Sequence, residues 1–235
     1  MKNLIVITGG TKGIGRAIAF KFASKGWDVV NCSSNPENLE NFSKEFQALF
    51  PNQKLYAFQT DLSVPEQVKG FCNEILKLNR PIQVLVNNAG IFMPGSILEE
   101  AEGVLEYQLA INLQSAYYVS RAIIPTMIKN EKGSVFTICS TASITPYING
   151  GSYCISKFAL LGMTKVLREE LKDKGIRVTA VLPGATLTNS WKGTTLPESR
   201  FMKPEDVAES IYSAYKLSDR TVVEEILIRP QEGDI

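Results

Sequence analysis

The stretch Leu4-Ile-Val-Ile-Thr-Gly-Gly-Thr-Lys-Gly-Ile-Gly15 decides the fold of this 235-residue chain. Its first four residues form a continuous apolar run, which is typical of a strand buried on both faces of a parallel sheet. From residue 14 to residue 25 apolar side chains recur at helical spacing, and the pattern stops at Gly26. The chain therefore begins with a strand, a glycine turn and a helix, which is the setting in which a glycine motif indicates nucleotide binding.

The alternation of strand and helix continues along the rest of the chain. Further strands are expected at 28–32, 54–58, 82–86, 134–139, 177–182 and 222–228. Helices are expected at 38–50, 65–78, 98–129 with a break near Asn112, 153–172 and 206–215. No linker, repeat or low-complexity segment interrupts this pattern. It predicts one α/β domain over 1–235, a Rossmann-like, doubly wound three-layer sandwich around a mostly parallel seven-stranded sheet.

Composition narrows the function. Lys and Arg number 25 against 24 Asp and Glu, with no basic block, so neither nucleic acid nor an anionic membrane is expected as a partner. The absence of histidine excludes an imidazole base, a Ser-His-Asp triad and histidine metal ligands, and no metal site is expected. Four cysteines without close pairing indicate a reducing compartment. Because no apolar run is long enough for a signal sequence or a membrane span, we expect a cytoplasmic protein.

The glycine turn has the features of a dinucleotide site. Gly9 allows the tight turn, Gly13 lets the backbone approach a pyrophosphate, and Gly15 allows the helix to pack closely on the strand. The helix end adds amide donors and positive potential. A plain glycine turn is the alternative, which the position after the first strand of an α/β chain disfavours.

The end of the second strand indicates which ribose is accepted. Residues 31–36 contain no carboxylate, which would bind a free 2′-hydroxyl and repel a 2′-phosphate. Lys12 adds a cation near the same end of the cofactor, and Ser33 and Ser34 add hydroxyls. The sequence thus favours NADP(H) over NAD(H), with these three residues as phosphate ligands. A solvated loop lysine is the alternative for Lys12.

Tyr153 and Lys157 form a candidate acid/base pair. They lie one turn apart if a helix begins near Ser152, and an adjacent cation favours the phenolate. Ser140 stands thirteen residues before Tyr153, at the end of an apolar run. By itself the pair also fits a core ring beside a surface amine, which is the commoner arrangement.

Together these residues resemble a short-chain dehydrogenase/reductase of the compact, single-domain type, over essentially the whole chain. The motifs are Thr8-Gly9-x3-Gly13-Ile14-Gly15, Asn87-Asn88-Ala89-Gly90, Asn112, Ser140 with Tyr153-x3-Lys157, and Pro183-Gly184 with Thr188. The resemblance implies a Rossmann domain, a nicotinamide cofactor, and hydride exchange with the CH–OH or carbonyl group of a small molecule.

The resemblance also implies roles for the site residues. Tyr153 is the proton donor in reduction and the base in oxidation, and Ser140 hydrogen-bonds the carbonyl oxygen. Lys157 lowers the pKa of Tyr153 and holds the nicotinamide ribose, and Asn112 anchors a water that links Lys157 to solvent. The implied cofactor contacts are Gly9, Thr11, Lys12, Gly13, Ile14, Gly15, Ser33, Ser34, Asp61, Leu62, Asn87, Ala89, Gly90, Tyr153, Lys157, Pro183, Gly184, Thr186 and Thr188.

Three of these contacts have simpler alternatives. Asp61 and Thr188 also fit residues that cap turns, and Asn87 also fits a residue that braces a strand end. Residues 185–202 are the expected substrate lid, in which Trp191 either lines an apolar pocket or anchors the lid.

We therefore expect an NADP(H)-dependent carbonyl reductase, similar to the 3-oxoacyl reductases, whose substrate the sequence does not name. The alternatives are an NAD-dependent alcohol dehydrogenase of the same family and a non-catalytic dinucleotide-binding regulatory protein. The last is disfavoured because dinucleotide binding alone needs neither Ser140 nor Tyr153. By the resemblance a homodimer or homotetramer is expected, with Val119, Ile123 and Met163 as apolar interface candidates.

Overall fold

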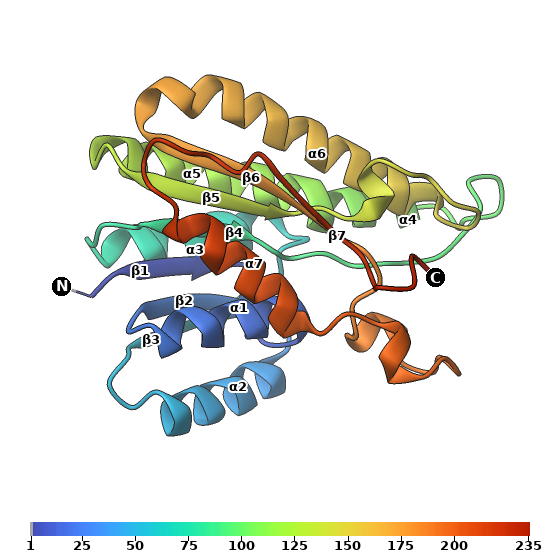
Figure 1. The fold of residues 1–235 in the computed structure, drawn as a ribbon, viewed down its shortest axis with the longest axis horizontal. Coiled ribbons are helices and arrows are strands. Elements are labelled where there is room, and N and C mark those ends of the chain that lie inside the picture. The colour runs from blue at the N-terminus through green and yellow to red at the C-terminus, as the bar shows by residue number, and fades with distance from the viewer. Residues whose placement is uncertain (1) are drawn as a thin grey trace.

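The computed structural model describes residues 2–235 and builds them around a seven-stranded sheet (Figure 1). The strand order is β3-β2-β1-β4-β5-β6-β7, and every neighbouring pair is parallel, so the sheet is wholly rather than mostly parallel. The strands are β1 (Leu4–Ile7), β2 (Asp28–Ser33), β3 (Leu55–Gln59), β4 (Val84–Asn87), β5 (Gly133–Ile138), β6 (Ile176–Pro183) and β7 (Glu225–Ile228). The order reverses between β1 and β4, which is where doubly wound sheets bind ligands.

Helices cover both faces of the sheet and complete the three layers expected from the sequence (Figure 1). They are α1 (Gly13–Ser24), α2 (Pro36–Leu49), α3 (Pro65–Lys77), α4 (Val104–Leu109), α5 (Ser115–Lys129), α6 (Gly151–Leu171) and α7 (Pro204–Lys216). Apolar residues of α1, α2 and α7 share one core cluster, and those of α3 and α5 share another across the sheet.

Strand β1 shows why its apolar run decides the fold. All four of its residues are fully buried. Leu4 and Val6 belong to the core cluster on one face, whereas Ile5 and Ile7 belong to the cluster on the other. Each such side chain stabilises the fold by about 1.5–3 kcal/mol relative to exposure, so a polar residue at any of these positions would be costly.

The helical region expected at 98–129 is the main difference from the sequence prediction. It begins only at Val104, because Gly103 precedes it in the left-handed conformation at φ 85°. The break expected near Asn112 is a π-helical turn over Ala110–Gln114, in which the Ser115 N–H bonds the Ala110 carbonyl. Of the other elements, the last strand is also shorter than expected and spans only Glu225–Ile228.

Two of the three interface candidates were wrong. Val119 and Ile123 are fully buried, because α5 turns these side chains into the core beneath the sheet. Met163 is partly buried against a third cluster that includes Leu160. Exposed apolar side chains of α5 and α6 lie elsewhere, at Tyr117, Tyr118, Ile155, Phe158 and Val166.

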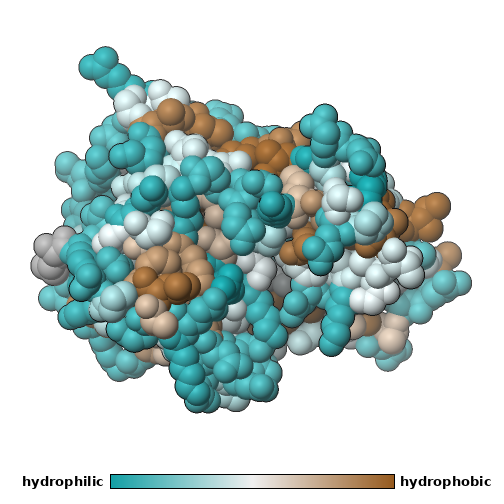
Figure 2. Space-filling model, turned by 60° about the horizontal axis from the view of Figure 1, so that its bottom comes forward, coloured by the Kyte–Doolittle hydropathy of each residue, from teal (hydrophilic) through white to brown (hydrophobic). Residues whose placement is uncertain are grey.

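The surface is largely polar on the face shown in Figure 2, where apolar residues form separate groups. Within residues 2–235, no helix combines the length and apolar character needed to cross a membrane.

Candidate active site

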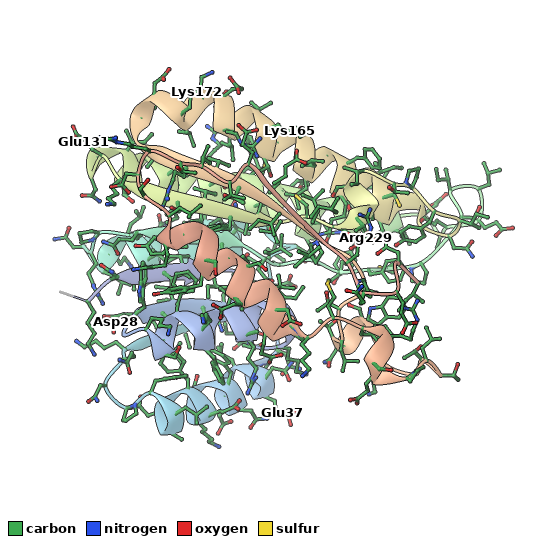
Figure 3. The ribbon with its side chains drawn as sticks, viewed as in Figure 1. Asp28, Glu37, Glu131, Lys165, Lys172 and Arg229 are labelled. Atoms are coloured by element: carbon green, nitrogen blue, oxygen red, sulfur yellow. The ribbon has the colours of Figure 1, made fainter. Side chains whose placement is uncertain are left out.

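A cavity of about 770 Å³ opens at the carboxyl edge of the sheet. Its walls come from the ends of the strands and the segments that follow them, as expected for an open α/β sheet. The volume lies within the usual range for sites that enclose a small ligand or cofactor. In Figure 3 Arg229 lies at this end of the molecule, whereas Asp28 and Glu131 lie at the other end of the strands.

The glycine loop, residues 9–15, forms one wall. Gly9 and Gly13 have φ of +64° and +52°, which disfavours any other residue. An added Cβ would lie 3.1 Å from Ala89 Cα at Gly9, and 3.0 Å from Thr188 Cγ2 at Gly13. The first turn of α1 contains no acidic residue, and no side chain caps it. Its first amides are therefore left for an anion, so these residues fit the pyrophosphate of a dinucleotide.

Hydrogen bonds from the segment after β4 hold the glycine loop. Thr8 Oγ1 accepts from the backbone N–H groups of Asn88 and Ala89, both at 3.0 Å. Asn88 Nδ2 donates to the carbonyls of Thr8 at 2.9 Å and Gly9 at 3.0 Å. Asn88, rather than Asn87, is therefore the asparagine that ties β4 to the loop.

Asn87 is the one predicted cofactor contact that does not line the cavity. Its side chain is buried, and Nδ2 donates to Ser120 Oγ at 2.9 Å on α5. The alternative, a residue that braces the strand end, describes its side chain better. The other predicted cofactor contacts all line the cavity.

Ser33, Ser34, Asp61 and Leu62, at the end of β2 and in the segment after β3, also line the cavity. Asp61 Oδ1 accepts from the N–H and the hydroxyl of Ser63, at 2.9 and 2.7 Å, so this carboxylate also caps a turn. Within the described chain, no carboxylate forms an ion pair with Lys12, which lines the cavity beside the glycine loop.

Ser140, Tyr153 and Lys157 line the same cavity. Ser140 lies two residues beyond β5 and caps a short 3-10 turn at Thr141–Ser143, since its Oγ accepts from the Ala142 N–H at 3.1 Å. Tyr153 lies in the first turn of α6, and its ring packs edge-on against Phe92 with centroids 4.9 Å apart. The segment after β5 and the first two turns of α6 thus bring the three side chains together.

Burial raises the pKa of the Tyr153 phenol, and the hydrogen bond with Ser140 only partly opposes it. The lowered pKa of Tyr153 expected from Lys157 is not seen in this structure, in which burial is the largest effect on the phenol. Lys157 Nζ lies 5.8 Å from the centre of the Tyr153 ring and donates to the Ile138 carbonyl at 2.9 Å. Burial also lowers the pKa of Lys157 to about 8. A tyrosine phenol is protonated at neutral pH, which is the form that can donate a proton.

Asn112 lies behind the cavity wall rather than on it. Its Oδ1 accepts from the Ile91 N–H at 2.7 Å, and Nδ2 donates to the Ile91 carbonyl at 3.0 Å and to Ser156 Oγ at 2.9 Å. A Cβ on Gly90 would lie 3.3 Å from Lys157 Nζ and 3.4 Å from Asn112 Oδ1. Asn112 therefore joins the segment after β4 to α6 immediately beside Lys157.

Several cavity residues escaped sequence reasoning, namely Phe92, Tyr107, Tyr147, Asp234 and Ile235. Phe92 and Tyr147 lie on connections after strands, Tyr107 on the short helix α4, and Asp234 and Ile235 at the end of the sequence. No motif in the sequence marks these positions. Asp234 pairs with Arg229 Nε at 2.7 Å and leaves no room for a side chain at Gly184.

The expected lid residues form two 3-10 turns, Asn189–Trp191 and Glu198–Arg200. Thr188 Oγ1 accepts from the Ser190 N–H at 3.4 Å and so caps the first turn. Trp191 lines the cavity and also packs on Phe201 with ring centroids 4.9 Å apart. Trp191 therefore lines the cavity, as one of the two expectations has it, and its role as the anchor of a lid stays a prediction.

Known proteins resemble this chain along its length. A model of the short chain dehydrogenases matches residues 3–198. Sepiapterin reductase of Chlorobaculum tepidum is 33% identical over 243 residues, covering 100% of this chain and 99% of that protein. The 3-oxoacyl-acyl-carrier-protein reductase of Thermotoga maritima is 34% identical over 221 residues, covering 89% and 88%.

A solved structure agrees with these relatives. The crystal structure of a metagenomic short-chain oxidoreductase in complex with NADP superposes with a TM-score of 0.84 at 29% identity, covering 97% of both chains. The fold, the matched family model and the full-length relatives lead to one conclusion. The chain belongs to the short-chain dehydrogenase family and is an oxidoreductase.

Proposed function

We propose that this protein is an NADP(H)-dependent carbonyl reductase. The observation that carries the proposal is that the glycine loop and the set Ser140, Tyr153 and Lys157 line one cavity. A regulatory protein that only bound the dinucleotide would need the loop but not Ser140 or Tyr153. The relatives named reductases, one of them matching over the whole chain, support the same reading.

The bound nicotinamide would supply the hydride, so the protein must orient the carbonyl and manage one proton. Ser140 Oγ already accepts from the Ala142 N–H, which leaves its own hydrogen to donate toward Tyr153 or the carbonyl oxygen. Tyr153, whose phenol is protonated at neutral pH, donates the proton to that oxygen as negative charge develops. Lys157 has two N–H donors beyond its bond to Ile138, and these are available to ribose hydroxyls.

The cavity lining supports a ring-bearing carbonyl as the substrate class. Four aromatic side chains, Phe92, Tyr107, Tyr147 and Trp191, line the cavity that also contains Ser140. Flat apolar groups stack well on such rings. The test is NADPH oxidation, followed by absorbance, over a panel that contains sepiapterin, a 3-oxoacyl thioester and simple aryl and alkyl ketones. Binding of NADPH without turnover of any carbonyl would favour the regulatory alternative. Faster NAD-dependent alcohol oxidation would favour the dehydrogenase.

We expect the catalytic efficiency, kcat/KM, to be at least about tenfold higher with NADPH than with NADH. Lys12, Ser33 and Ser34 would hold the 2′-phosphate, and a hydrogen bond to a charged group contributes about 1.5–3 kcal/mol. Lys12→Ala should therefore lower the efficiency with NADPH about tenfold and leave that with NADH nearly unchanged. Steady-state kinetics of both proteins with both cofactors measures this. Equal or better efficiency of the unaltered protein with NADH would contradict the preference.

We further propose that residues 1–235 form a single domain with 185–202 as the substrate lid, and that the enzyme works in the cytoplasm. The four free, buried cysteines support a reducing compartment.

We expect a homodimer or homotetramer, assembled through α5 and α6. Their exposed apolar side chains include Tyr117, Ile155, Phe158 and Val166, of which Val166 is 56% exposed. Such residues on neighbouring helices gain by being covered. Size-exclusion chromatography with light scattering should give a multiple of 25.9 kDa. A single species of that mass itself would rule out the assembly.

A further inference from the structure

The helix that carries Tyr153 has no cap of its own. Helix α6 begins at Gly151, and its N-cap residue is Gly150, which has no side chain to bond the first amides. The first four N–H groups of a helix need partners from elsewhere. Tyr153 is the third residue of α6, so fraying of this turn would move the phenol directly.

Glu100 supplies the missing partner from a distant part of the chain. Its Oε1 accepts from the Ser152 N–H at 2.9 Å, and its Oε2 accepts from the Ser152 hydroxyl. The two residues are 52 positions apart. A carboxylate at this end also interacts favourably with the helix dipole.

Two glycines make room for this contact. A Cβ at Gly95 would lie 3.2 Å from Glu100 Oε1, and one at Gly151 would lie 3.0 Å from Glu100 Cδ, with still closer clashes to the same residue at both sites. Gly95 also donates its N–H to the Asn149 carbonyl at 2.9 Å and forms a parallel bridge with Gly150. The segment after β4 and the start of α6 are thus locked together around the Glu100 carboxylate.

The same segment also contacts Tyr153 directly, through Phe92. It is held by Asn112 at Ile91 and by Gln108, whose Oε1 accepts from the Met93 N–H at 3.2 Å. Phe92, between these two anchors, packs against the Tyr153 ring. Glu100 is the third anchor of the segment, and the only one of the three that bonds the first turn of α6.

We propose that Glu100 is a positioning residue that holds Tyr153 in line with Ser140 by capping α6 from the segment after β4. The inference rests on the proposed function, because it concerns the geometry of the proton donor. Glu100 does not line the cavity, so its loss should disturb proton transfer and leave cofactor binding intact.

The experiment compares Glu100→Ala with Glu100→Gln, which keeps an acceptor, and with Ser152→Ala. Small displacements of a catalytic group can cost up to about 10²-fold, so kcat for carbonyl reduction should fall about 10- to 100-fold in Glu100→Ala. The dissociation constant of NADPH, from fluorescence titration, should stay within about twofold. Glu100→Gln should recover part of kcat. The double variant Glu100→Ala/Ser152→Ala should lose no more than Glu100→Ala alone, because the hydroxyl bond that Ser152→Ala removes is already lost with the Glu100 carboxylate.

Glu99→Ala is the matched control, since Glu99 is the exposed neighbour and makes no side-chain bond in the described chain. If neither the unaltered protein nor Glu99→Ala reduces any carbonyl, the proposed function fails. If both proteins reduce a carbonyl and kcat of Glu100→Ala stays within twofold of theirs, only the positioning role is overturned. If kcat and the fraction of protein that binds NADPH fell by the same factor, in Glu100→Gln as in Glu100→Ala, the effect would be one of folding. This result would also overturn the positioning role.

Discussion

Tyr153→Phe is expected to slow carbonyl reduction by about 10²–10⁴-fold, the usual contribution of a general acid. The substitution removes the phenol that would give its proton to the substrate oxygen. It keeps the ring, so the packing against Phe92 at 4.9 Å is preserved. Ser140 Oγ still accepts from the Ala142 N–H, so its position should not change. Single-turnover reduction under saturating NADPH measures the proton-transfer step without product release.

Tyr118→Phe provides the control for this substitution. Tyr118 is 37% exposed on α5 and does not line the cavity, so removal of its hydroxyl should leave turnover unchanged. NADPH titration of both variants should match the unaltered protein. If Tyr153→Phe turned over within about tenfold of it, Tyr153 would not be the general acid.

Gly13→Val should weaken NADPH binding by more than about tenfold, which corresponds to about 1.4 kcal/mol. Gly13 has φ +52°, a conformation that costs other residues about 1–2 kcal/mol and is worse for a branched side chain. Even a single Cβ would lie 3.0 Å from Thr188 Cγ2, on the wall where the pyrophosphate is expected. The loop must therefore shift away from the geometry that offers its amides to the phosphates. Fluorescence titration with NADPH measures the loss.

Gly70→Ala is the matched glycine control. Gly70 lies in α3, and an added Cβ there would meet no atom within 4 Å. This change should preserve NADPH affinity and stabilise the helix by up to about 1 kcal/mol. An affinity of Gly13→Val within threefold of the unaltered protein would show that the glycine loop does not hold the dinucleotide.

The order of elements could be predicted because the central strands are wholly buried. A strand such as Leu4–Ile7 must be apolar on both faces, and the resulting continuous apolar run can be recognised in the sequence alone. The strand ends then bring residues far apart in sequence to one edge. That geometry is why the glycine loop, Ser140 and Tyr153 could be expected to meet before any coordinates were known.

The sequence predictions that the structure corrects depend on how the elements pack together. The resemblance suggested that apolar residues of α5 lie at a subunit interface, but the sequence could not show whether the sheet or another subunit covers them, and Val119 and Ile123 belong to the core. Two consecutive asparagines stand at the end of β4, Asn87 as its last residue and Asn88 just beyond it, and only the structure shows that Asn88 supports the glycine loop. The pKa of Tyr153 depends on how deeply the assembled site buries it, which spacing does not reveal.

The π-helical turn at Ala110–Gln114 has a consequence for how the chain tolerates changes in length. Because Ser115 bonds back five residues to Ala110, this turn contains one residue more than a regular helix of the same rise. Deleting one residue there would restore the regular ladder and leave α4 and α5 in line, but a residue of the turn itself, such as Asn112, would move by up to about 100° around the helix axis. Gln108 and Asn112 could then no longer both reach the segment after β4. Removing a single residue from 110–114, without any substitution, would therefore break the hydrogen bonds that Asn112 makes behind Lys157.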